Sequence, residues 1–166
     1  MSNITSNSPG DAIPAQVDVR GPRFVAWVTT FVLVATLLTS TSSTAAAAVI
    51  LGVQAVVFAI GALLGPRRHP YGFVFATLIA PRLGPVTERE PVPPLKFAQL
   101  VGLLFAVVGV IGFASGIPLL GLIATGFALI AAFLNAAFGI CLGCQLYPLV
   151  ARFRPKPAAS TTGSIR

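Results

Sequence analysis

The stretch Ala45–Gly72, AAAAVILGVQAVVFAIGALLGPRRHPYG, decides the fold. Its apolar part runs to Leu64 without a charged side chain, and about 20 such residues form a helix long enough to cross the ~30 Å hydrocarbon core of a bilayer. Glycine, prolines and two arginines follow at once, and these residues end a helix and stay in water or among lipid headgroups. The stretch predicts a transmembrane helix that ends at a basic loop.

The rest of the chain repeats this pattern. Of its 166 residues, 55% are hydrophobic and only 9% are charged, whereas a soluble domain carries about 25% charged residues. Apolar segments at approximately 24–41, 44–64, 96–115 and 118–141 are each near the length of a membrane span, and the last of them allows a continuation to Val150. We therefore predict an all-α membrane protein with four transmembrane helices, arranged as two antiparallel hairpins.

The connection between the second and third spans, Gly65–Pro94, is rich in proline and arginine. Its apolar insert YGFVFATLIAP (71–81) is too short to span a bilayer and predicts a short interfacial helix, with a re-entrant piece as the alternative. We expect residues 1–16 and the basic segment 154–166 to be disordered tails, and residues 17–153 to form the transmembrane domain.

The basic residues predict the orientation. All eleven lysines and arginines flank the spans on one side, while the connections STSST (40–44) and SGIP (115–118) carry no charge. By the positive-inside rule, that side and both termini face the cytoplasm. Because the basic residues lie beside apolar segments and form no stripe of their own, we expect the lipid bilayer as a partner and no nucleic acid.

Small residues recur along three of the predicted helices and let helix backbones approach closely in lipid. The members are Ala45, Ala48, Gly52, Ala55, Ala59 and Ala62 on the second helix, Gly102, Ala106, Gly109, Gly112 and Gly116 on the third, and Ala124, Ala128, Ala132 and Ala136 on the fourth. We interpret them as packing faces within the bundle, with contacts in a homo-oligomer as the alternative.

No Asp, Glu, Lys, Arg or His lies within the apolar runs 24–39, 45–64, 97–114 and 119–140 of these segments, which argues against a proton relay or an ion-coupled transporter. Three amides remain, Gln54, Gln99 and Asn135. We predict that they make polar contacts between helices, with Gln99 and Asn135 at similar depth and able to pair. A contact with a substrate is the alternative.

The proline-rich loop presents Arg67, Arg68, Tyr71 and Arg82. Arginines bind anionic headgroups and tyrosine anchors at the interface, so we predict contacts with lipid, or alternatively with a docking partner. His69 is the only histidine, and alone it does not indicate a metal site or a catalytic base.

The only two cysteines, Cys141 and Cys144, have the spacing C-x-x-C at the end of the fourth apolar segment. If that helix continues, the i, i+3 spacing places both sulfurs on one face at the cytoplasmic boundary. A permanent disulfide is disfavoured in a reducing compartment, and zinc needs four ligands and hence a dimer. A redox-active pair and two buried packing residues both remain open, and we expect no metal and no cofactor.

Several motifs together resemble one bacterial family of integral membrane proteins, a domain of unknown function numbered 4395. They are RGPRF (20–24), PRRHPYG (66–72), PRLGP (81–85), FAQLVGLLF (97–105) and LNAAFGICLGC (134–144). The resemblance covers about Val17 to Phe153 and implies an inner (plasma) membrane protein whose terminal CLGC maps onto Cys141 and Cys144. It also implies a cytosolic thioredoxin-like or rhodanese-like partner. Gln145 stands where the family pattern has an acidic residue, which weakens a role for a carboxylate beside the cysteines.

Three functional hypotheses follow. The first is a membrane-bound dithiol that takes part in thiol redox or sulfur transfer at the cytoplasmic face, with Cys141 and Cys144 as the reactive pair. The second is a membrane scaffold or assembly subunit with purely structural cysteines. The third, a carrier for a small uncharged solute, is the weakest because the spans hold no charged residue.

Overall fold

A computed structural model describes residues 15–152. Its four long helices are α1 (Arg20–Ser40), α2 (Thr44–Leu64), α4 (Val92–Ala114) and α5 (Pro118–Phe138). Each is long and apolar enough to cross a membrane. The chain is therefore an all-α, four-span membrane protein, which confirms the predicted fold class. The predicted tails lie almost entirely outside the described residues.

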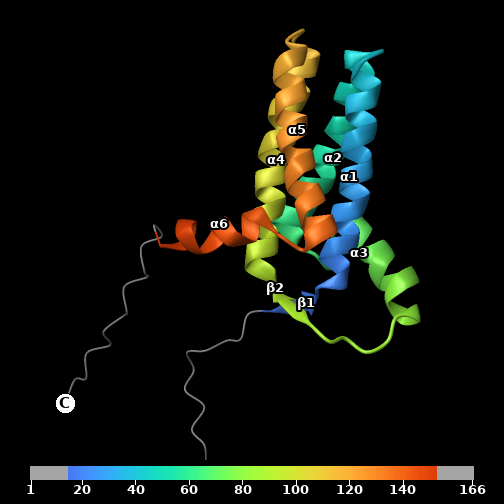
Figure 1. Cartoon of the computed structure of the whole chain (residues 1–166), viewed down its shortest axis with the longest axis vertical. Helices are drawn as coiled ribbons and strands as arrows, with labels where there is room; N and C mark the ends of the chain where they lie inside the picture. Colours follow the sequence, from blue (N-terminus) through green and yellow to red (C-terminus); the bar gives the residue numbers. More distant parts are fainter. Residues whose placement is uncertain (1–14, 153–166) are drawn as a thin grey trace, which may run out of the picture.

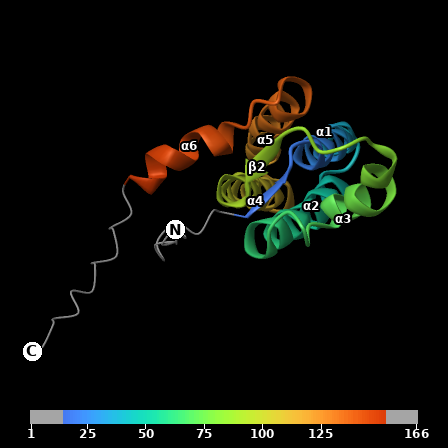
Figure 2. The ribbon, with the colours of Figure 1, turned by 90° about the horizontal axis from the view of Figure 1, so that it is seen from below.

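The four spans form a ring in which each helix packs on two others (Figure 1, Figure 2). Short turns join α1 to α2 and α4 to α5 at the uncharged end of the bundle. The main contacts run between α2 and α4, α1 and α5, α4 and α5, and α1 and α2. Each helix therefore packs on the helix that it joins through a short turn. It also packs on one helix of the other pair.

Local chemistry sets several of the helix ends. The hydroxyl of Ser43 accepts a hydrogen bond from the N–H of Ala46 at 3.2 Å and so caps α2. Pro118 occupies the first turn of α5, where its missing N–H removes no helical hydrogen bond. Gly65 ends α2 with a φ of 85°, a conformation that favours glycine.

Glycines on α4 create the closest packing in the bundle. A Cβ on Gly112 would lie 2.4 Å from the backbone nitrogen of Gly121 on α5, and a Cβ on Gly109 would lie 2.5 Å from the side chain of Leu51 on α2. Among residues 15–152, Leu51 and Leu33 are the largest fully buried apolar side chains. The predicted packing faces of the third and fourth helices are therefore largely buried, although Gly116 is exposed in the turn.

The packing face predicted on α2 is confirmed only in part, since Ala48 and Ala55 pack against the core but other members do not. Ala45 is exposed, and a Cβ on Gly52 would meet nothing within 4 Å. The buried face instead carries Leu51 and Phe58, which fill the space left by the glycines of α4. Large side chains of α2 pack against the glycines of α4, so this contact does not need small residues on both helices.

The short elements gather at the other end of the bundle, where the basic residues lie (Figure 1). A two-stranded antiparallel sheet pairs β1 (Gln16–Asp18) with β2 (Arg89–Pro91). The loop helix α3 (Pro70–Val74) continues into a wider turn over Phe75–Ile79 and a tighter one over Ala80–Arg82. The sequence did not predict the strands, because three residues are too few to display a two-residue alternation.

The fourth apolar segment does not continue as one helix to Val150. Helix α5 ends at Phe138, and a separate helix, α6 (Leu142–Ala151), leaves the bundle at a steep angle to it (Figure 1). Gly139 causes the break: it has a left-handed φ of 70°, and its N–H and that of Ile140 return to the carbonyls of Asn135 and Leu134. Pro148 lies inside α6 and does not end the preceding helix.

Candidate functional site: the cysteine pair and the cavity beside it

The cysteine pair lies at the beginning of α6. Cys141 is the N-cap residue, and Cys144 lies in the first helical turn. The sulfurs are therefore brought together by the start of a new helix, and not by the face of a continuous one as the spacing alone suggested. Both side chains are half-buried.

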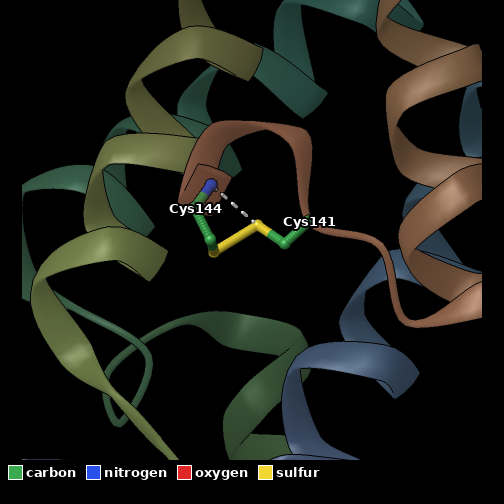
Figure 3. Close-up of a disulfide and its surroundings, with 2 residues drawn as sticks. All are labelled: Cys141 and Cys144. Carbon is green, nitrogen blue, oxygen red and sulfur yellow. Dashed lines mark hydrogen bonds between the residues drawn. A yellow bond between two sulfur atoms is a disulfide. The ribbon is translucent and has the colours of Figure 1, made fainter. Parts of the chain in front are cut away.

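The structure joins Cys141 and Cys144 in a disulfide with a Cα–Cα distance of 5.1 Å (Figure 3). This differs from the expectation that the pair is reduced, an expectation that rested on the compartment and not on geometry. The backbone N–H of Cys144 also donates to the sulfur of Cys141 at 3.2 Å. An N–H at a helix N-terminus stabilises negative charge, so this arrangement favours a thiolate on Cys141 once the bond is reduced.

Helix α6 is held against the N-terminal part of α4. A Cβ on Gly143 would lie 2.6 Å from the Cα of Ala98, so only glycine allows this approach. The rings of Phe97 and Tyr147 meet edge to face at 6.1 Å on the same side. These contacts hold the start of α6, and with it the two cysteines, beside the bundle.

A cavity of about 560 Å³ opens inside the bundle at this end, between α1, α4 and α5. Its size is within the usual range for small-molecule sites. Most of its wall is apolar, and Cys141 is part of that wall. The uncharged polar residues that line it are Gln16, Thr29, His69, Gln99 and Asn135.

His69 is the most deeply buried titratable residue of this site, at 1% exposure. Its ring fits against Gly61, where a Cβ would lie 2.6 Å from the imidazole Cδ2. Within residues 15–152, neither ring nitrogen has a hydrogen-bond partner, nor does the Oε1 atom of Gln99. Burial lowers the pKa of His69 to about 4, while the nearby Gln99 side chain acts in the opposite sense. The imidazole is therefore neutral at physiological pH.

Sequence reasoning set His69 aside because it is the only histidine. The signal that would have found it is the motif GPRRHPYG itself, in which prolines on either side confine the residue next to the end of α2. Its burial depends on Gly61 and α4, which no local pattern reveals.

The three predicted polar contacts turn out differently from one another. Gln54 is buried, and its Oε1 accepts a hydrogen bond from the hydroxyl of Tyr71 at 2.9 Å, which ties α2 to α3. Tyr71 thus makes a contact within the protein, in addition to any with lipid or a partner. Gln99 and Asn135 both line the cavity, but no hydrogen bond joins them.

Several basic side chains of the charged end bind backbone carbonyls. Lys96 donates to the carbonyl of Leu63 at the end of α2, at 2.7 Å, and Arg23 to that of Ala137 near the end of α5, at 3.4 Å. Cations at helix C-termini are stabilising. Arg82 likewise bonds to the carbonyl of Leu78, whereas Arg67 and Arg68 are exposed. The structure leaves these last two open to lipid or to a partner.

Within the described part of the chain, no three His, Cys, Asp or Glu side chains lie together as metal ligands. Residues 17–152 match the family profile described as "Domain of unknown function (DUF4395)". The chain belongs to this family. No curated protein and no solved structure matches the chain. The description carries no activity, so the geometry of this family member has to support any functional proposal.

Proposed function

We propose that this membrane protein uses Cys141 and Cys144 as a cytoplasm-facing dithiol, which exchanges electrons or sulfur with a thioredoxin-like or rhodanese-like protein. The observation that supports the proposal is the position of the pair at the N-terminus of α6, with the N–H of Cys144 directed at the sulfur of Cys141. This hydrogen bond caps α6, and at a helix N-terminus it also stabilises a thiolate on Cys141. Half-burial also leaves both sulfurs within reach of a partner.

The exchange proceeds through a mixed disulfide. In one direction, the thiolate of Cys141 attacks a disulfide sulfur of the partner, whose other sulfur leaves as a thiolate; the Cys144 thiolate then attacks Cys141, the Cys141–Cys144 bond forms and the partner leaves with two thiols. The reverse direction runs through the same intermediate. With a persulfide partner, Cys141 takes the outer sulfur and the partner leaves as a thiolate.

The test is to replace one cysteine at a time. Cys144→Ser leaves Cys141 to attack and removes the thiol that resolves the intermediate. We therefore expect a mixed disulfide with the partner protein that is visible on a non-reducing gel and is lost when reductant is added. Cys141→Ser should give less adduct, because Cys144 lacks the stabilising N–H. No adduct from either single variant, together with wild-type behaviour of the double variant, would instead favour a scaffold with structural cysteines.

A further inference from the structure

The cavity at the charged end contains polar atoms that the protein leaves without partners. Both nitrogens of His69 and the Oε1 atom of Gln99 have none among the described residues, although both side chains line the cavity. A buried polar atom without a hydrogen bond is destabilising, so such atoms need a water molecule or a ligand. Three in one cavity of about 560 Å³ indicate a ligand site.

The wall restricts the kind of ligand. The polar side chains that the spans contribute, Thr29, Gln99 and Asn135, carry no charge, and the buried His69 is neutral as well. The charged residues that border the cavity, Asp18, Arg67 and Arg89, lie outside the predicted spans. An ion in the inner part would therefore lose its hydration without gaining a counter-charge. An apolar ligand that carries carbonyl oxygens and gains hydroxyl groups on reduction fits: the protonated ring nitrogen of His69 can donate to a carbonyl, while the other ring nitrogen and Gln99 Oε1 can accept from hydroxyls.

Cys141 belongs to the same wall, so a bound ligand lies beside one sulfur of the pair. A fatty acyl chain would fill the apolar wall but leave the polar atoms unpaired. A nucleotide cofactor would bring phosphate groups into the inner part of the cavity, which the spans line without a cation. A quinone combines a flat apolar ring, two carbonyl oxygens and solubility in the bilayer, and it accepts two electrons.

We propose that the cavity binds a membrane quinone, which oxidises the Cys141–Cys144 dithiol. This rests on the proposed dithiol function and gives it a direction. The two thiols lose two electrons and two protons and the S–S bond forms; the quinone takes up both electrons and two protons, and each carbonyl oxygen becomes a hydroxyl of the quinol. The disulfide is then ready to accept electrons from the cytosolic partner. The protonated ring nitrogen of His69 donates to a quinone oxygen, and Gln99 Oε1 accepts from a hydroxyl once the quinol forms, while Cys141 lies beside the ring.

The experiment uses the full chain, purified in detergent, reduced, and freed of reductant without oxygen. A short-chain ubiquinone is added, its ultraviolet absorbance is followed, and the remaining thiols are counted. We expect one quinone reduced for every two thiols lost. Ala132→Phe fills the cavity, while Ala35→Phe adds the same ring to an exposed site on α1. The first change should abolish quinone reduction and the second should leave it unchanged. Gln99→Leu should slow it roughly tenfold, the effect of one buried hydrogen bond.

Oxidation of each variant by a small soluble disulfide, which does not need the cavity, shows whether its cysteines are still correctly placed. Equal quinone reduction by Ala132→Phe and the unchanged chain would overturn the proposal, because the quinone would then act from the detergent. Binding of the quinone to a variant with both cysteines replaced by serine separates the two proposals. If the quinone binds to this variant and the single-cysteine variants form no adduct with a partner, the quinone site stands and the dithiol function falls. If those variants form adducts but the quinone neither binds nor consumes thiols, only the quinone proposal falls.

Discussion

At the scale of single residues, His69 is a deeply buried titratable side chain. It is buried beside Gly61 and Gln99 with no hydrogen-bond partner for its ring among the described residues, and it is neutral because protonation would bury a charge. A neutral imidazole can donate from one nitrogen and accept at the other, which suits a ligand with oxygen atoms. Its burial also makes stability depend on pH.

We expect the protein to lose stability as the pH falls from 6.5 towards 4. Above 6.5, His69 is neutral in both the folded and the unfolded state; below it, only the unfolded state binds the proton until the folded pKa of about 4 is reached. The free energy of unfolding should fall by about 3 kcal/mol over this interval. Thermal unfolding in detergent at several pH values measures it. His69→Gln removes the titration, and equal pH dependence in both proteins would contradict this role.

At the scale of the elements, glycines decide how closely the helices pack. Gly112 brings α4 against the backbone of α5, and Gly143 brings α6 against α4. In lipid, where burial of apolar surface gives no drive between helices, such contacts supply dispersion energy. The second of them also positions the cysteines, so packing and the proposed chemistry meet in the first turn of α6.

Gly112→Ala should destabilise the bundle by about 1–3 kcal/mol, because the added methyl group meets the backbone of Gly121 and the helices must separate. Gly52→Ala is the matched control: its Cβ enters open space, and the better helix propensity should be neutral or stabilising by about 0.5–1 kcal/mol. Unfolding in a denaturing detergent compares the two variants. A larger loss from Gly52→Ala would contradict the observed packing.

At the scale of the whole molecule, polarity is separated along the bundle axis. The sheet, α3 and α6 lie at one end with the basic residues, and the uncharged turns lie at the other (Figure 1). The cysteine pair and the cavity are at the basic end. If the positive-inside rule holds for this chain, the candidate site faces the cytoplasm.

Labelling with a thiol reagent that cannot cross membranes tests this orientation. After mild reduction, we expect Cys141 and Cys144 to react in inside-out vesicles and not in intact cells. Ser115→Cys, in a chain whose two cysteines are replaced by serine, is the control at the opposite end, since Ser115 is exposed in the α4–α5 turn. It should show the reverse pattern. Labelling of Cys141 in intact cells would overturn the orientation and, with it, a cytosolic partner.

The sequence by itself determined the four-span architecture and the position of the cysteines at the basic end. Length, hydropathy and charge are properties of contiguous segments, and a bilayer selects on those properties directly. Motifs likewise sufficed for membership of the family. The candidate pair Cys141 and Cys144 was also found this way, because both residues lie within four positions of each other.

Only the tertiary structure decided which residues share a site. His69, Gln99 and Cys141 come from three separate parts of the chain, and they line one cavity because α2, α4 and α6 approach through Gly61 and Gly143. The break at Gly139 likewise became visible only as a left-handed backbone. Such features depend on contacts between distant segments, for which a single sequence contains no periodic pattern, since the complementary partner of each small residue lies on another helix.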